Sequence, residues 1–131
     1  MIFDAKLMFL NEEAIQDFSG GNLGKALDLG VPSQMRGRTA YVAVQCADNT
    51  TATGDPVISF ALETSGTEDF LEVTTIPLSI PKMKKGDLKA GAAFFAPCPL
   101  YSLRFVRLVL DTSLPITCAE LSAGIVLDPQ I

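Results

Sequence analysis

Apolar and polar residues alternate with a period of two along short segments of the chain, and Gly, Pro, Asn and Asp separate these segments. In residues 57–64 the large apolar side chains of Ile58, Phe60 and Leu62 occupy alternate positions, which fall on one side of an extended chain. Residues 104–110 are apolar on both sides apart from their arginines, which predicts a strand in the centre of its sheet. A period of two with frequent turn residues indicates an all-β protein.

About eight strands account for the whole pattern. Residues 41–46 and 120–127 alternate like the two segments above, and four weaker segments complete the set: 6–9, 25–28, 71–76 and 92–96. About eight antiparallel strands joined by turns predict a jelly roll or a related β-sandwich. The candidate for a helix is a single turn over residues 11–15, which Asn11 would cap.

The first ten residues are mostly apolar, although Asp4 interrupts them, and they precede any turn signal. Their large hydrophobic side chains include Phe3, Leu7, Met8, Phe9 and Leu10. Such a segment forms either an edge strand or an N-terminal arm that packs onto a neighbouring molecule. We favour the arm, and we predict that these residues contribute to intersubunit contacts, because apolar segments and unpaired strand edges are ready docking surfaces.

Size and composition predict one folded domain over residues 1–131. Hydrophobic residues make up 48% of the chain and charged residues 19%, which supplies enough apolar material for a core. The formal net charge is -5, which disfavours binding to a phosphate backbone because that binding depends on clustered cations. Nucleic acid is therefore not an expected partner. A membrane is not expected either, because no apolar run approaches the ~18–20 residues that span a bilayer.

The sequence does not predict catalysis. It contains no histidine, which removes the usual general base and the Ser-His-Asp and Cys-His arrangements. The glycine-rich residues 19–26 depart from a phosphate-binding loop, because Ser19 replaces the first glycine and Ala26 the magnesium-binding hydroxyl. A turn before a strand is the better interpretation of that segment.

The cysteines also carry no recognisable motif. Three of them, without C-x-x-C spacing, indicate reduced thiols rather than a disulfide framework or a zinc site: Cys46, Cys98 and Cys118. We therefore predict no catalytic residue, no cofactor and no metal.

Two groups of cations are candidates for a protein interface. Lys82, Lys84 and Lys85 form a dense basic stretch, which either binds an acidic patch on a partner or keeps a loop in water. Arg104 and Arg107 are three residues apart, so a regular strand would place them on opposite faces of its sheet. Arg107 is either an anchor at a subunit interface or part of a surface salt bridge.

The C-terminal residues 117–130 resemble the ending of a family of small tailed-bacteriophage capsid cement proteins, which are also called decoration proteins. Three further segments are similar to that family in the same order: residues 7–9, 28–30 and 103–108. The spacing and overall length agree across nearly the whole chain. The chain departs from the family at Cys118-Ala119, where a small residue followed by glycine is expected, and at residues 114–116, where the family tends to a glycine-containing hairpin.

The resemblance implies a jelly-roll structural protein without catalytic activity. It implies binding to the outer face of an icosahedral phage head, where a homo-oligomer, with a trimer favoured over a dimer, would cement neighbouring subunits of the major capsid protein. The protein would be made in the host cytoplasm and located on the outer surface of the virion. The alternative function is a jelly-roll carbohydrate-binding module, which shares the architecture but stacks sugars on exposed aromatic rings.

Overall fold

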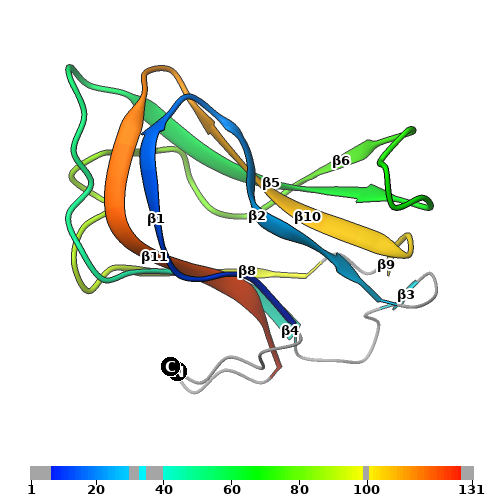
Figure 1. Ribbon diagram of the computed structural model, residues 1–131. Coiled ribbons are helices and arrows are strands. Elements are labelled where there is room, and N and C mark those ends of the chain that lie inside the picture. The colour runs from blue at the N-terminus through cyan, green and yellow to red at the C-terminus, as the bar shows by residue number, and fades with distance from the viewer. Residues whose placement is uncertain (1–6, 30–32, 35–39, 99–100, 128–131) are drawn as a thin grey trace.

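The computed structural model describes residues 7–29, 33–34, 40–98 and 101–127, most of which lie in two packed antiparallel β-sheets (Figure 1). The strands in this part of the chain are β1 (Met8–Phe18), β2 (Gly21–Asp28), β3 (Ser33–Gln34), β4 (Ala40–Cys46), β5 (Val57–Ser65), β6 (Thr74–Pro77), β7 (Met83–Lys84), β8 (Ala93–Pro97), β9 (Tyr101–Ser102), β10 (Phe105–Thr112) and β11 (Ile116–Leu127). Within these described ranges, no helix has the length and apolar character needed to cross a membrane.

The eight longer strands are wound as a jelly roll. Sheet A has the strand order β1-β11-β4-β8, and sheet B has the order β2-β10-β5-β6, with the short β7 pairing with the start of β5. Among the described residues, the two-residue strands β3 and β9 pair with each other. Most consecutive long strands cross from one sheet to the other, as in a jelly roll. The predicted fold class, an all-β jelly-roll sandwich of about eight antiparallel strands, is confirmed.

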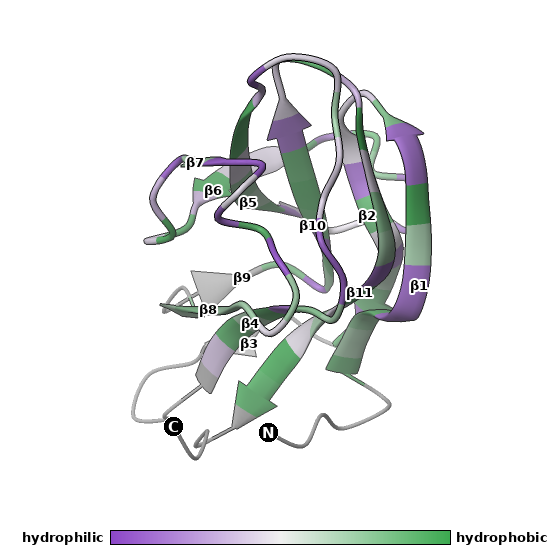
Figure 2. Ribbon diagram, turned by 90° about the vertical axis from the view of Figure 1, so that its left-hand side faces the viewer, coloured by the Kyte–Doolittle hydropathy of each residue, from purple (hydrophilic) through white to green (hydrophobic). Residues whose placement is uncertain are grey.

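The core lies between the two sheets and is built from the alternating positions of the central strands. Ile58, Phe60 and Leu62 of β5 are buried, as their spacing predicts. They belong to one hydrophobic cluster with side chains of sheet A, among them Val44 and Leu121. Strand β10 lies between β2 and β5, which confirms its predicted central place. Figure 2 shows β10 hydrophobic along its middle and hydrophilic at its C-terminal tip.

Strand β1 forms an edge of sheet A and pairs with β11. Of the two interpretations of residues 1–10, the edge strand is therefore the one that applies to residues 8–10, while Phe3 lies outside the described residues. The predicted helical turn over residues 11–15 is wrong, because that segment is extended within β1. Its residues are mostly polar because most of them face solvent at the sheet edge.

Irregular pairing hides the strand period in β1. The register with β11 shifts four times along the strand, so buried and exposed positions do not alternate regularly. Glu12 and Asp17 have φ angles of 48° and 47°, and their backbone N–H groups donate to the hydroxyls of Ser122 and Thr117 at 2.9 and 3.0 Å. Side chains of β11 thus satisfy backbone donors that a regular ladder would have paired.

The hairpin from β1 to β2 closes one side of the sandwich. Its turn lies at Ser19 and Gly20, in agreement with a turn before a strand. Gly24 has φ 76°, and a Cβ at this position would overlap the backbone carbonyl of Phe9. The two strands belong to different sheets but pack together here, and only glycine fits the contact. The remaining sheet edges, β6 and β8, lie at the other ends of the two strand orders.

Candidate interaction surface

The candidate surface is the outer face of sheet B, which points away from sheet A. On β10 the buried Val106 and Leu108 point into the core, so Phe105 and Arg107 point outward. The register places Glu63 of β5 directly opposite Arg107. Two arginine–aromatic stacks lie on this face, and each is held by a carboxylate from a neighbouring strand.

Arg107 is fixed from two directions. Its Nε donates to Glu63 Oε1 at 2.7 Å, and its guanidinium carbon lies 4.1 Å from the centre of the Phe70 ring. The side chains of Arg107 and Glu63 are 23% and 21% exposed, so solvent weakens the ion pair to roughly 1 kcal/mol or less, and the stack on Phe70 adds a similar ~0.5–1 kcal/mol. Within the chain, Arg107 therefore forms the salt bridge that was one of its two predicted roles.

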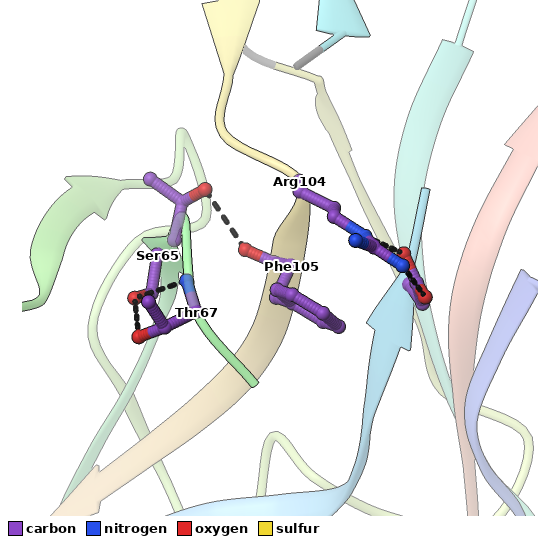
Figure 3. Close-up of polar contacts among 6 residues, drawn as sticks. Ser65, Thr67, Arg104 and Phe105 are labelled. Carbon is purple, nitrogen blue, oxygen red and sulfur yellow. Dashed lines mark hydrogen bonds and ion pairs between the residues drawn. The ribbon is translucent and has the colours of Figure 1, made fainter. Parts of the chain in front are cut away.

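Arg104 lies on the same side of sheet B as Arg107, which corrects the expectation of opposite faces. The reason is that β10 begins only at Phe105, so Arg104 is outside the regular alternation. Its Nε and Nη2 donate to both carboxylate oxygens of Asp28 at 2.8 and 2.9 Å, and its guanidinium covers the Phe105 ring at 4.9 Å (Figure 3). The hydrogen bonds to Asp28, followed by its charge, raise the pKa of Arg104.

The loop of residues 66–73, between β5 and β6, folds onto this face. Phe70 has φ 53° and is 8% exposed, because its ring lies against Arg107. The next residue, Leu71, is 81% exposed, and Val73 is 40% exposed. The Thr67 backbone oxygen accepts a bond from Phe70 N at 3.1 Å, and the Thr67 side chain contacts Ser65 (Figure 3). These contacts hold the loop against sheet B, and Leu71 and Val73 form its exposed apolar tip.

The basic stretch lies at the opposite end of β5. Met83 is buried against the core. Lys84 is exposed and pairs with Val57 of β5, whose side chain is exposed too. Lys85 donates from Nζ to the Ala52 carbonyl at 3.1 Å, so it ties two loops together, while Lys82 is exposed. Val57 and Glu63 are six positions apart on β5, about 20 Å at ~3.3 Å per residue. Lys84 and Arg107 therefore occupy one sheet at separate ends.

The N-terminal residues predicted to contribute to intersubunit contacts do not lie on the candidate surface. Met8, Phe9 and Leu10 are buried inside the chain, and Leu7 is half-buried against the core. The buried three are therefore core residues of this chain rather than an exposed arm. Pairing of β1 with β11 is the physical reason, since it commits these side chains to the sandwich. Phe3 lies outside the residues that the structure describes.

Sequence reasoning missed the loop of residues 66–73. The pattern predicts a strand over residues 71–76, whereas β6 begins at Thr74. The available signal was the acidic setting of Phe70 and Leu71, because Glu68, Asp69 and Glu72 surround them and such charges favour a solvated loop over a strand.

The described residues contain no candidate metal cluster, and the depression with an aromatic ring beside Arg104 is a poor sugar site. They hold no group of three or more Cys, Asp and Glu side chains that could bind a metal ion. The shallow depression beside Arg104 and Thr67 contains the Phe105 ring, but that ring is 8% exposed, which leaves little area for stacking a sugar.

Comparison with known proteins adds no assignment: no family model matches the chain, and no curated protein matches its sequence.

Proposed function

We propose that the chain is a non-enzymatic structural protein of a tailed-phage head, which binds the outer surface of the shell as a homo-oligomer and cements neighbouring major capsid protein subunits. Two lines of support come together in this proposal. The fold is a jelly-roll sandwich, and residues 103–108 and 117–130 resemble the cement proteins at the points described above. Production in the host cytoplasm and location on the outer virion surface are parts of the same proposal.

The observation that carries the proposal is the anchored loop of residues 66–73. Leu71 is the most exposed of the large hydrophobic side chains described, and it follows directly on Phe70, which Arg107 holds in place. An apolar side chain on a rigid support loses little conformational entropy when it docks. Such a tip suits a hydrophobic pocket on a protein surface better than it suits a sugar.

The other contacts of the proposed assembly are assigned by chemistry. Lys82 and Lys84 are exposed, and we assign them the role of orienting the protein on an acidic region of the shell, because charge complementarity acts mainly on orientation and association rate. The terminal strands β6 and β8 of the two sheets offer edges to a second copy of the chain. Closed cyclic symmetry is expected of the homo-oligomer, and the resemblance to the cement proteins favours a trimer over a dimer.

The test is co-sedimentation with heads assembled from the cognate major capsid protein, using Leu71→Asp as the variant. A charge at the tip would have to be buried on docking, so the affinity should fall about tenfold or more, that is by ~1.4 kcal/mol or more. Leu114→Asp is the matched control, because Leu114 is also exposed, at 39%, but lies in the turn between β10 and β11.

Three outcomes separate the possibilities. Sedimentation of the unmodified protein at a fixed ratio to the shell subunit, with selective loss in Leu71→Asp, supports the proposal and the contact. Equal binding of both variants contradicts the contact at Leu71. A protein that stays in the supernatant contradicts the cement function, and a glycan-binding screen would then address the carbohydrate-binding alternative. Light-scattering mass of the free protein measures the oligomer directly.

A further inference from the structure

Two cysteine side chains from neighbouring strands of sheet A meet in the core. The Sγ atom of Cys46, on β4, lies 3.2 Å from the Sγ atom of Cys118, on β11. Both are free thiols, and neither side chain reaches the surface. The third thiol, Cys98, is half-buried and stands apart from this pair. The sequence does not reveal the contact, because 72 positions separate the two residues.

A bulge in β11 creates the contact. From Glu13 to Ile15 the register advances two residues on β1, whereas on β11 it passes from Leu121 to Cys118, which is three residues. Both Leu121 and Cys118 are buried in consequence, although strict alternation would have turned one of them outward. The extra residue aims the Cys118 side chain at the end of β4, where Cys46 is the last residue.

The thiols are protected as long as the neighbouring loop is closed. Both face the backbone oxygen of Asp48, at 2.7 Å from Cys46 Sγ and 3.7 Å from Cys118 Sγ. Burial is the main cause that raises the pKa of the Cys46 thiol to about 11, so the reactive thiolate is scarce in the closed protein. Asn49 fastens the loop by accepting a bond from Ala90 N at 3.0 Å. Oxidation therefore requires a local opening of residues 47–50.

We propose that Cys46 and Cys118 form an intrachain disulfide when the protein meets a low-molecular-weight disulfide oxidant. One protein thiolate attacks a sulfur of the oxidant, so that a mixed disulfide forms and one reduced thiol leaves. The second protein thiolate then attacks the protein sulfur of the mixed disulfide, which forms the bond between the two cysteines and releases the second reduced thiol. The protein loses two protons and two electrons, and the oxidant gains them.

The cross-link would join β4 to β11 at the place where they already touch. Disulfides are rare in a reducing cytoplasm and persist in oxidising surroundings outside the cell. The biological role rests on the proposed function: the protein would fold and bind the shell with reduced thiols, and the bond would form after the virion leaves the host. The chemical step itself does not depend on that function.

The experiment uses the purified reduced protein and oxidised glutathione at neutral pH. The reaction is quenched by unfolding the protein in urea together with an alkylating reagent, so that buried thiols also react, and the protein is analysed by intact mass and by peptide mapping without reduction. We expect the loss of two hydrogen atoms, one alkylated thiol at Cys98, and a peptide pair linked through Cys46 and Cys118. Urea well below the unfolding midpoint should accelerate the reaction, because it promotes opening of the loop.

Matched variants identify the bond. Cys98→Ser should oxidise like the unmodified protein, whereas Cys46→Ser and Cys118→Ser should yield no intrachain cross-link. The melting temperature of the unmodified protein should rise on oxidation and return on reduction. Three alkylated thiols after an incubation that fully oxidises the urea-unfolded chain would overturn the proposal, and so would a cross-link to Cys98. If the disulfide forms but the protein does not bind phage heads, the result contradicts the proposed function and leaves the disulfide proposal standing.

Discussion

Replacement of Gly24 by alanine tests whether the close approach of β1 and β2 stabilises the sandwich. Gly24 has φ 76°, a conformation that costs an alanine ~1–2 kcal/mol. The added Cβ also overlaps the backbone of Phe9, which has no flexible side-chain end to move aside. Strand β1 must shift away from β2, and the shift loosens the packing of Phe9 and Leu10, which are 2% and 3% exposed.

The magnitude follows from these two contributions. A partial loss of core packing for two large side chains costs ~2–3 kcal/mol, so the total destabilisation is about 3–5 kcal/mol, a large part of the ~5–15 kcal/mol that stabilises an ordinary domain. Gly91→Ala is the matched control, because Gly91 has φ 85° but a Cβ there meets nothing within 4 Å. The free energy of unfolding of the control should therefore fall only by the ~1–2 kcal/mol that the backbone conformation costs.

Urea unfolding followed by far-ultraviolet circular dichroism measures both variants, since the chain contains no tryptophan for fluorescence. The expected result is a midpoint that falls much further for Gly24→Ala than for Gly91→Ala, with equal slopes. If the two free energies of unfolding agree within ~0.5 kcal/mol, the contact between Gly24 and Phe9 is not a constraint on the fold, and the reasoning fails.

Three further predictions concern charge and exposure. Arg107→Met and Glu63→Gln, made singly and together, should give a coupling energy of about 0.5–1 kcal/mol in urea unfolding, because the pair is only partly buried; a value near zero would contradict the ion pair. Burial raises the pKa of the Cys46 and Cys98 thiols from 9.0 to about 11, so the unfolded chain loses these protons first and the free energy of unfolding should fall as pH rises through this interval. Cys98→Ala should reduce that slope, and an unchanged slope would refute the assignment. Leu71→Asp should alter the free energy of unfolding by less than ~0.5 kcal/mol, since Leu71 is 81% exposed; a larger loss would mean that the tip packs against the protein.

The sequence predicts best those strands that bury one face. Residues 57–64 became β5 with Ile58, Phe60 and Leu62 inside, because a half-buried strand must alternate. Strand β1 escaped prediction over most of its length for the opposite reason. It lies at an edge, its register shifts repeatedly, and Ser122 and Thr117 from the far end of the chain satisfy its irregular backbone. No local pattern encodes such partners.

The candidate surface was only partly predictable. Residue type alone singled out Arg107, and the loop that covers it was mistaken for the start of a strand, because the turn at Phe70 depends on a tertiary contact with that arginine. The meeting of Cys46 and Cys118 depends on a bulge in β11. Both features arise from how distant segments pack, which spacing along the chain does not report.

The pairing of the first long strand with the last sets the order in which the protein can fold. Met8 lies opposite Gly124, so β1 has no hydrogen-bonding partner strand until β11 has left the ribosome. Because β11 lies between β1 and β4, sheet A is completed only after β11 has been synthesised. Pairing over such separations is slow, typically ~ms to s for β-sandwiches. During that interval Phe9 and Leu10 remain uncovered, and nascent chains halted before residue 116 should associate with chaperones or aggregate.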